Sequence, residues 1–268
     1  MSEPIPEPRP KRKIRLSISR RRLVEFTVVV LGVLVALGLE NLVQEARYRG
    51  DARDLERAII SDLAEAVEQS TERQAVKACL ARQLQTLLHR VDGNTVDLTD
   101  EFAVPRSAFP YVLSQGYRSP TRVWNTASFD RALGSEAFKR IPNGRAANYA
   151  ALFAQIELQD EFSQMEFLAA SRLAPLALHQ PNIDAQVRAE ALKDIANVDR
   201  IQALLAIGSE QIIEATLSVP EVGEAVRRDL IGSSNREVIE ASKAAIRTTY
   251  GDCVDLTVYD RLNTPATS

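Results

Sequence analysis

The sequence predicts an all-α protein, in which one N-terminal transmembrane helix is followed by an antiparallel helical bundle. Residues 26–39 form an apolar run without a single charge. Farther along the chain, apolar residues recur at spacings of three and four, which is typical of amphipathic helices. No alternating pattern of useful length indicates a strand, although residues 103–113 could hold a short extended segment.

Residues 1–22 form a basic arm that we expect to be disordered and cytoplasmic. Proline occupies positions 4, 6, 8 and 10, which disfavours helix. Eight cations against two acidic residues give the arm a net charge of +6, so the remainder of a chain with total charge −3 carries −9. Because phosphate contacts need clustered Lys and Arg, we expect no nucleic-acid partner for this acidic remainder.

The apolar run predicts a membrane span only if it is extended at both ends. Its 14 residues cover ~21 Å at ~1.5 Å per residue, less than the ~30 Å hydrocarbon core. Extension to Leu23 and Val43 gives 21 residues, or roughly 31 Å. Glu25 then lies near one end, and Glu40 lies near the other. The length therefore predicts a transmembrane helix over residues 23–43.

Two other interpretations of this run remain open. A basic arm, an apolar stretch and the small-residue triplet 36–38 are typical of a cleaved signal peptide, whose removal would leave a secreted soluble helical protein. The 22-residue arm and the apolar Leu39, Leu42 and Val43 beyond the triplet favour an uncleaved anchor instead. A buried core helix has the least support, because eight cations precede the run.

The charge distribution predicts the orientation of the anchor. Lys and Arg close to a span are held on the cytoplasmic side, and eight of them precede this one. In a Gram-negative bacterium the chain would be an inner-membrane protein, with a periplasmic helical domain over residues 44–260 and a disordered tail over 261–268. Gly32 and Ala36 form a small-xxx-small pair that could pack two spans together, or could simply fill an apolar helix.

Two stretches resemble an uncharacterised bacterial family of single-span membrane proteins. The first is EFTVVVLGVLVALGLENLVQEARYRGDARDLERAIISDL, residues 25–63, and the second is residues 121–157 with AANYAALFAQIE. Together they cover about a third of the chain. The resemblance implies a basic arm, a span and a helical extracytoplasmic domain, and it implies no activity. Many relatives have an aromatic residue after the acidic or amide pair, where this chain has Leu42 and Val43.

The domain begins with a long amphipathic helix from residue 51, which could be continuous with the span through Gly50. It is expected to end at Asp92-Gly93, before a loop over residues 93–120. The apolar face of this helix is formed by Leu55, Ile59, Leu63, Val67, Leu80, Leu84 and Leu87.

Six further helices are expected, and capping residues mark the starts of four of them. A short helix covers residues 121–132, and Ser135 caps another. Asn143 caps a long helix with the face Tyr149, Phe153, Ile156, Phe162, Met165 and Leu168, closed by Pro175 and Pro181. Asp184 caps the next helix. A capping box at residues 218–221 opens another, and the last helix runs over residues 235–250.

The sequence predicts no catalytic residue, no metal ligand and no cofactor. His89 and His179 are the only histidines, and they are isolated from one another. Cys79 and Cys253 are too few for a zinc site. In an oxidising compartment they could form one disulfide, and otherwise they are two unrelated buried thiols.

Residues 117–124 form the most distinctive local cluster. Arg118, Arg122 and Trp124, the only tryptophan, could contact an anionic or aromatic ligand or a partner. Alternatively, the tryptophan fills the bundle while the aliphatic parts of the arginines cover its surface. We expect a non-enzymatic interaction or scaffolding protein that binds another protein or itself. The alternative is a periplasmic ligand-sensing domain that signals through a partner.

Overall fold

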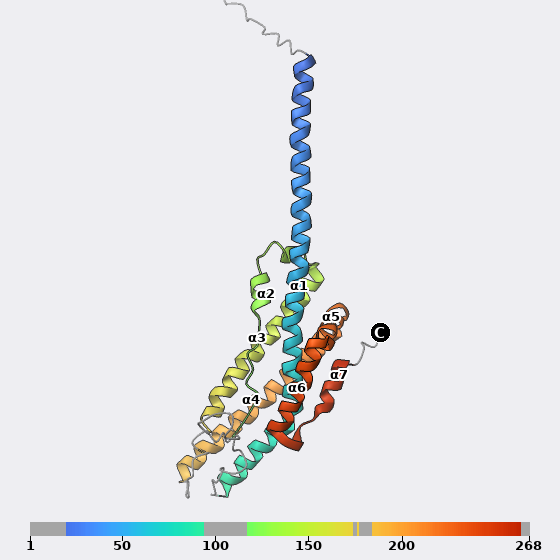
Figure 1. Cartoon of the computed structure of the whole chain (residues 1–268). Helices are drawn as coiled ribbons and strands as arrows, with labels where there is room; N and C mark the ends of the chain where they lie inside the picture. Colours follow the sequence, from blue (N-terminus) through green and yellow to red (C-terminus); the bar gives the residue numbers. More distant parts are fainter. Residues whose placement is uncertain (1–19, 94–116, 174–175, 177–183, 264–268) are drawn as a thin grey trace, which may run out of the picture. The chain divides into compact units, whose positions relative to one another are not determined.

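The computed structural model describes residues 20–93, 117–173, 176 and 184–263, and these residues are helical without any strand (Figure 1). The chain divides into two compact units, Met1–Gly50 and Asp51–Ser268. Helix α1, Arg20–Asp92, belongs to both units. It begins three residues before Leu23, where the sequence places the start of the span.

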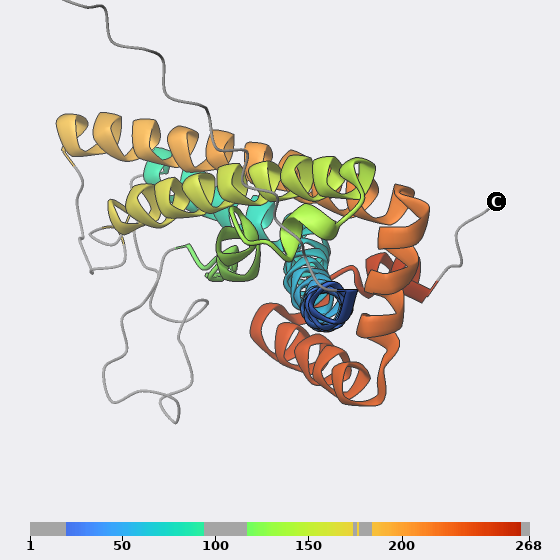
Figure 2. The same cartoon turned by 90° about the horizontal axis from the view of Figure 1, so that it is seen from above.

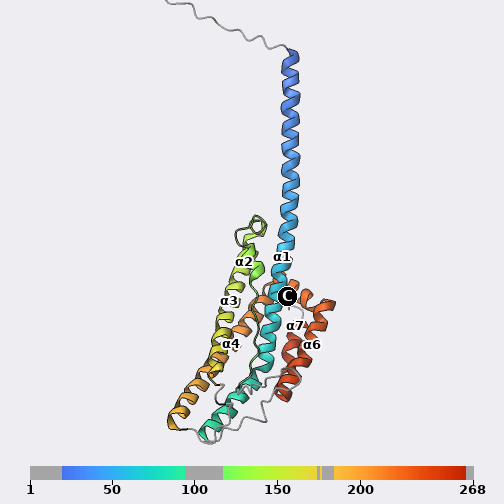
Figure 3. The same cartoon turned by 60° about the vertical axis from the view of Figure 1, so that its left-hand side comes forward.

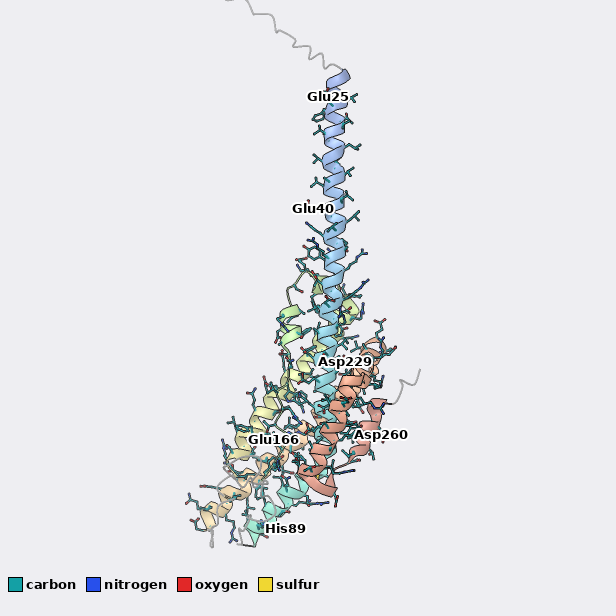
Figure 4. The ribbon with its side chains drawn as sticks, viewed as in Figure 1. Glu25, Glu40, His89, Glu166, Asp229 and Asp260 are labelled. Carbon is teal, nitrogen blue, oxygen red and sulfur yellow. A yellow bond between two sulfur atoms is a disulfide. The ribbon has the colours of Figure 1, made fainter. Side chains whose placement is uncertain are left out.

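The first unit contributes the apolar part of α1. All side chains from residue 24 to residue 43 are exposed. An 18-residue window of this stretch has a mean hydropathy of 2.2, and none of the window is buried. The helix is therefore long and apolar enough to cross a membrane. Glu25 and Glu40 flank most of the apolar side chains (Figure 4).

The second unit contains the remaining helices. In chain order they are α2 Ala127–Ala132, the 3₁₀ helix η1 Phe138–Arg140, α3 Asn143–Ser171, α4 Ala185–Ser218, α5 Pro220–Ile231, α6 Ser233–Tyr250, the 3₁₀ helices η3 Gly251–Cys253 and η4 Leu256–Tyr259, and α7 Asp260–Asn263.

Within this unit, residues 51–92 of α1 lie between the α3–α4 pair and α6 (Figures 2 and 3). The face predicted from the apolar spacing is buried, except that Leu55 is half-buried. Ile59, Leu63, Val67 and Leu80 are wholly inaccessible to solvent. This part of α1 therefore forms the centre of the core.

Helices α3 and α4 approach each other closely at one buried amide. The side-chain nitrogen of Gln159 donates to the carbonyl of Leu205 at 2.8 Å and to the hydroxyl of Ser209 at 2.9 Å. A Cβ at Gly208 would lie 2.2 Å from Oε1 of Gln159. The small residue at position 208 thus leaves the space that this amide occupies.

The C-terminal segment is attached to α1 by one covalent bond and one backbone bond. Cys79 and Cys253 form a disulfide with a Cα–Cα distance of 5.2 Å. The backbone N–H of Asp255 donates to the carbonyl of Ala75 at 2.9 Å. Tyr259 and Leu262 are buried beyond this point, so ordered structure continues past residue 261, where the sequence analysis places the tail.

The predicted capping residues are partly correct. Asp184 accepts from the backbone of Val187 at 2.9 Å, as its position predicts. The hydroxyl of Ser135 accepts from the backbone of Phe138 at 3.0 Å, but the N-cap of η1 is Ala137, so the helix begins later than predicted. The cap at Asn143 is wrong, because that residue is already helical and Pro142 precedes it without a side-chain cap.

Two further helix starts differ from the sequence analysis. No capping box forms at residues 218–221, since Val219 is the N-cap of α5 and makes no side-chain cap bond, although a helix does start at Pro220. Helix α2 begins at residue 127 rather than 121, since residues 121–126 are fixed by contacts with α1 and α3 described below. The extended segment proposed for residues 103–113 lies outside the described residues.

The predicted face of α3 is correct only in its first half. Tyr149, Phe153 and Ile156 are buried, but Met165 is 46% exposed and Leu168 is 62% exposed. In the second half the buried positions are Gln159, Glu166 and Ala169. Polar side chains therefore take the inward positions there, and a pattern that follows only apolar residues assigns the wrong face.

Candidate functional site: the polar seam of α1

Four charged or amide side chains are buried along the central part of α1. Asp62, Gln69, Glu72 and Arg73 are each at most 7% exposed; they are called the polar seam below. Gln69, Glu72 and Arg73 lie where the predicted apolar face has its longest interval, between Val67 and Leu80, and Asp62 lies before this interval. Burial of such groups is costly unless they are hydrogen-bonded, so their partners define the local structure.

The segment over residues 117–128 supplies many of these partners. The guanidinium of Arg122 donates to both carboxylate oxygens of Glu72, at 2.6 and 2.8 Å. The amide of Gln69 donates to the carbonyl of Val123 at 3.3 Å. These contacts hold residues 121–126 in an irregular course along α1, which explains why the predicted helix starts late.

Asp62 fixes the start of α2. One of its oxygens accepts from the side chain of Asn125 at 3.2 Å, and the other accepts from the backbone of Ser128 at 3.0 Å. The carboxylate thus satisfies a free N–H group in the first turn of a helix, as a capping residue would. A residue 66 positions away in the chain performs this function.

Trp124 lies in the core, 8% exposed, and its indole N–H donates to the hydroxyl of Ser163 on α3 at 3.0 Å. Arg122 is exposed, but its charge is paired with Glu72. The backbone of Arg118 donates to the side chain of Gln83 at 2.8 Å. The three residues that the sequence singled out therefore contact different partners, and Arg122 borders two cavities.

The sequence analysis missed a second buried ionic cluster. Arg73 and Glu166 form a two-pronged ion pair between α1 and α3, with one N–O distance of 3.0 Å. The hydroxyl of Tyr117 donates to the same carboxylate at 2.7 Å. Burial, followed by the nearby charge of Glu166, raises the pKa of this tyrosine. In the sequence, this cluster was indicated by the long interval between Val67 and Leu80 in the predicted apolar face of α1.

A cavity of about 580 Å³ adjoins the polar seam and is called the α1–α6 cavity. Its lining comes from α1, α5 and α6, with Arg122 at its edge. The apolar part of the wall includes Leu230, Val238 and Ile239. Its acidic part includes Glu65 and Glu68 of α1 and Asp229 of α5.

Glu68 is half-buried in the wall of this cavity, and one of its oxygens accepts from the hydroxyl of Ser242 on α6 at 2.9 Å. Burial raises the pKa of the Glu68 carboxyl above its ordinary value, and the nearby carboxylates of Glu72 and Glu65 add to the increase. The hydrogen bond from Ser242 and the charge of Arg122 act in the opposite direction.

A larger cavity of about 950 Å³ is lined by residues of α1, α3 and α5 and is electrically balanced. Its four arginines face four carboxylates; Arg145, for example, lies 3.2 Å from Glu56 and 3.6 Å from Glu221. Burial raises the pKa of Tyr149 in its wall to about 12. This arrangement offers no excess charge to a ligand.

The described residues contain no group of three or more His, Cys, Asp and Glu side chains that could hold a metal ion. His89 lies exposed in the last turn of α1, whereas His179 lies outside the described residues. Gly32 and Ala36 both lie on the exposed apolar part of α1, and a Cβ at Gly32 would have no neighbour within 4 Å.

Comparison with known proteins gave no match to any family model, any curated protein or any solved structure. The class of this protein is therefore defined by its fold alone, as an all-helical protein with one long apolar N-terminal helix.

Proposed function

We propose that this chain is a single-pass bacterial inner-membrane protein whose helical domain lies in the periplasm and acts as a non-enzymatic interaction or scaffolding module. The observation that carries the proposal is the continuous exposure of every side chain from residue 24 to residue 43 on an apolar helix. Burial of one Val or Leu side chain is worth roughly 1.5–3 kcal/mol, so such a helix favours a lipid environment over water.

The proposed orientation rests on the cations of residues 9–22, which would remain in the cytoplasm. Residues 44–260 would then form the periplasmic domain. A periplasmic location agrees with the disulfide between Cys79 and Cys253, because disulfides persist in oxidising compartments.

We further propose that α4 runs antiparallel to its neighbours. Gln159 of α3 contacts Leu205 and Ser209 of α4, while Arg172 lies 3.9 Å from Asp194. As the residue number rises along α3, the residue number of the contact partner on α4 falls. This order supports opposite chain directions for the two helices. By the same reasoning, the pairs Glu56–Arg145 and Arg73–Glu166 support a parallel course for α1 and α3.

The interaction role is supported by apolar side chains on the outside of α3. Leu158, Met165, Phe167 and Leu168 are 46–62% exposed. Exposed apolar side chains that gather on one element favour contact with another protein, because association removes their surface from water. We propose a second protein or a second copy of this chain as the partner.

Fusion of reporters after residue 268 tests the topology. We expect a periplasmic alkaline phosphatase to be active and a cytoplasmic reporter to be silent. The reverse pattern would contradict the orientation. An antibody against an N-terminal tag, used on the same membranes, should detect the full-length chain; a mature chain that starts near residue 39 would show that the apolar helix is a cleaved signal peptide.

Crosslinking in intact membranes, followed by identification of the attached chains, tests the interaction role. We expect dimers or a recurrent partner protein, and less of either when Phe167 and Leu168 are replaced by Ser. A matched control replaces Val123, which is 82% exposed and lies outside α3. A monomer alone at every crosslinker concentration would contradict the proposal.

A ligand-sensing role is the second candidate, and the α1–α6 cavity favours it. Cavities of 300–1,000 Å³ are the usual size for small-molecule sites, and this one measures about 580 Å³. Purification of the full chain followed by mass spectrometry for retained small molecules would support this role if a stoichiometric compound is found.

A further inference from the structure

The α1–α6 cavity has one acidic wall and one apolar wall. The acidic wall belongs to α1 and carries Glu65 and Glu68, and Asp229 of α5 adds a third carboxylate to the lining. The apolar wall belongs mainly to α6 and the end of α5, where Leu230, Val238 and Ile239 line the space. A ligand that satisfies both walls must combine a positive charge with an apolar body.

An anion does not suit this cavity. The only cation in its lining is Arg122, and two nitrogens of that guanidinium are already bonded to the buried carboxylate of Glu72. An incoming anion would meet Glu65 and Glu68 without a free positive partner. Coulomb repulsion of a charge by like charges in a partly buried site is costly.

A metal ion is also a poor occupant. Ca²⁺ and Mg²⁺ take six or more oxygen ligands, whereas the lining offers the carboxylates of Glu65, Glu68 and Asp229 beside apolar side chains. Among the residues that the structure describes, no cluster of three or more acidic, His or Cys side chains could hold a metal.

Gln69 is 6% exposed and lines the cavity beside the two glutamates. Its amide nitrogen donates to Glu65 at 3.0 Å and to the carbonyl of Val123. Its amide oxygen has no hydrogen-bond partner among the described residues and almost no accessible surface, so a donor in the cavity would reach it only after the amide turns toward the cavity.

We propose that the α1–α6 cavity binds an organic cation, namely a primary ammonium group carried on a small apolar body. The ammonium would lie at the carboxylates of Glu65 and Glu68, and the apolar body would lie against Val238 and Ile239. An ammonium group has three N–H donors, which carboxylate oxygens accept. The inference does not depend on the membrane topology.

The charge state of Glu68 agrees with this assignment. Burial and neighbouring carboxylates raise the pKa of Glu68, which means that its ionised form is unfavourable in the empty cavity. A cation held there favours the ionised form. Binding of the ammonium should therefore release the proton from any protonated Glu68, and affinity should fall as the pH is lowered.

The probe for the test is 2-phenylethylammonium, with 2-phenylethanol as its neutral counterpart. Titration calorimetry on the full chain in a non-ionic detergent should show saturable binding of the amine and at least about tenfold weaker binding of the alcohol. Equal affinity for the two, or no saturable binding of the amine, would overturn the proposal.

Two variants locate the site. Glu68→Gln keeps an oxygen for the hydrogen bond from Ser242 but removes the charge, so the amine affinity should fall about tenfold or more. The matched control is Glu237→Gln, an exposed carboxylate on α6 that does not line the cavity. Unchanged affinity in Glu68→Gln would overturn the assignment.

A steric variant tests the same site if Glu68→Gln does not fold. Ala245 lines the cavity, whereas the neighbouring Ala244 does not. Ala245→Leu should fill the space and weaken binding of the amine, and Ala244→Leu should leave it unchanged. The proposal is wrong if both substitutions, in chains that keep their helical circular dichroism, have the same effect on affinity.

Discussion

Arg73 and Glu166 face each other across the buried contact between α1 and α3, with side chains only 5% and 3% exposed. Their sequence separation is 93 residues. The pair is completed by Tyr117, so a segment between the two helices shares the same carboxylate. Removal of either charge would leave the other one buried without an opposite charge.

Glu166→Gln should therefore destabilise the domain by about 3–5 kcal/mol, as expected when one member of a buried ion pair is lost. Chemical denaturation of the full chain, followed by the fluorescence of Trp124, measures the loss. The control is Glu136→Gln, which removes an exposed i, i+3 pair with Lys139 and should leave the denaturation midpoint unchanged. Equal midpoints for both variants would show that the buried pair does not stabilise the fold.

Gly223→Ala should destabilise the domain by about 1–3 kcal/mol through overpacking. A Cβ at this position would lie 2.6 Å from the backbone oxygen of Leu217, which cannot move without the α4–α5 junction. Gly144→Ala is the control, because its Cβ would meet nothing within 4 Å and alanine favours helix. In thermal denaturation, the melting temperature should be lower for Gly223→Ala than for the natural chain, and it should not be lower for Gly144→Ala.

Glu68→Gln should stabilise the ligand-free chain at neutral pH. Because burial raises the pKa of Glu68 in the folded state, the folded chain holds the proton more tightly than the unfolded chain. Stability is thus lost as the pH rises from the ordinary carboxyl range through the raised pKa. The advantage of the variant over the natural chain should shrink as the pH is lowered, and an advantage that is constant with pH would contradict this explanation.

Removal of the disulfide should destabilise the domain by about 5 kcal/mol in the chain-entropy model, because the bond closes a loop of 174 residues. Denaturation of the full chain with and without dithiothreitol measures the effect. The double variant Cys79→Ser, Cys253→Ser should match the reduced natural chain and should not respond to dithiothreitol. A natural chain whose midpoint is insensitive to the reductant would contradict the stabilising role.

Reduction should act mainly on α6. This helix has one fully buried apolar residue among those described, Ile246, and a polar contact from Ser242 to Glu68. The disulfide lies just after its C-terminal end. Hydrogen exchange of the reduced chain should therefore increase in α6 well before it increases in α3 or α4, and a uniform increase would show that the bond stabilises the whole domain equally.

The sequence was sufficient for features that depend on local chemistry. The apolar run of α1, the buried positions Ile59 to Leu87 and the cap at Asp184 follow from hydropathy, spacing and side-chain type alone. Each of these signals comes from residues within one helical turn or one helix, so no distant partner is needed to interpret it.

Features that depend on distant partners could not be predicted in this way. Asp62 looks like an exposed helix residue until Asn125 and Ser128 are placed beside it. The sequence analysis places residues 121–126 in a helix, but contacts of Arg122 and Trp124 with α1 and α3 hold them in an irregular course. Glu166 lies on the inward face of α3, where its carboxylate pairs with the guanidinium of Arg73 on α1. The sequence of α3 alone does not indicate this partner.

The bond between Cys79 and Cys253 also bears on biosynthesis. A chain made from its N-terminus at about 5–20 residues per second completes the 174 residues between them in roughly 9–35 s. For that interval Cys79 is a thiol without its native partner, open to mixed disulfides with other proteins. Any product interrupted before residue 253 keeps that thiol indefinitely. The second cysteine thus distinguishes finished chains from truncated ones, and thiol-directed quality control would have a chemical mark by which to retain the latter.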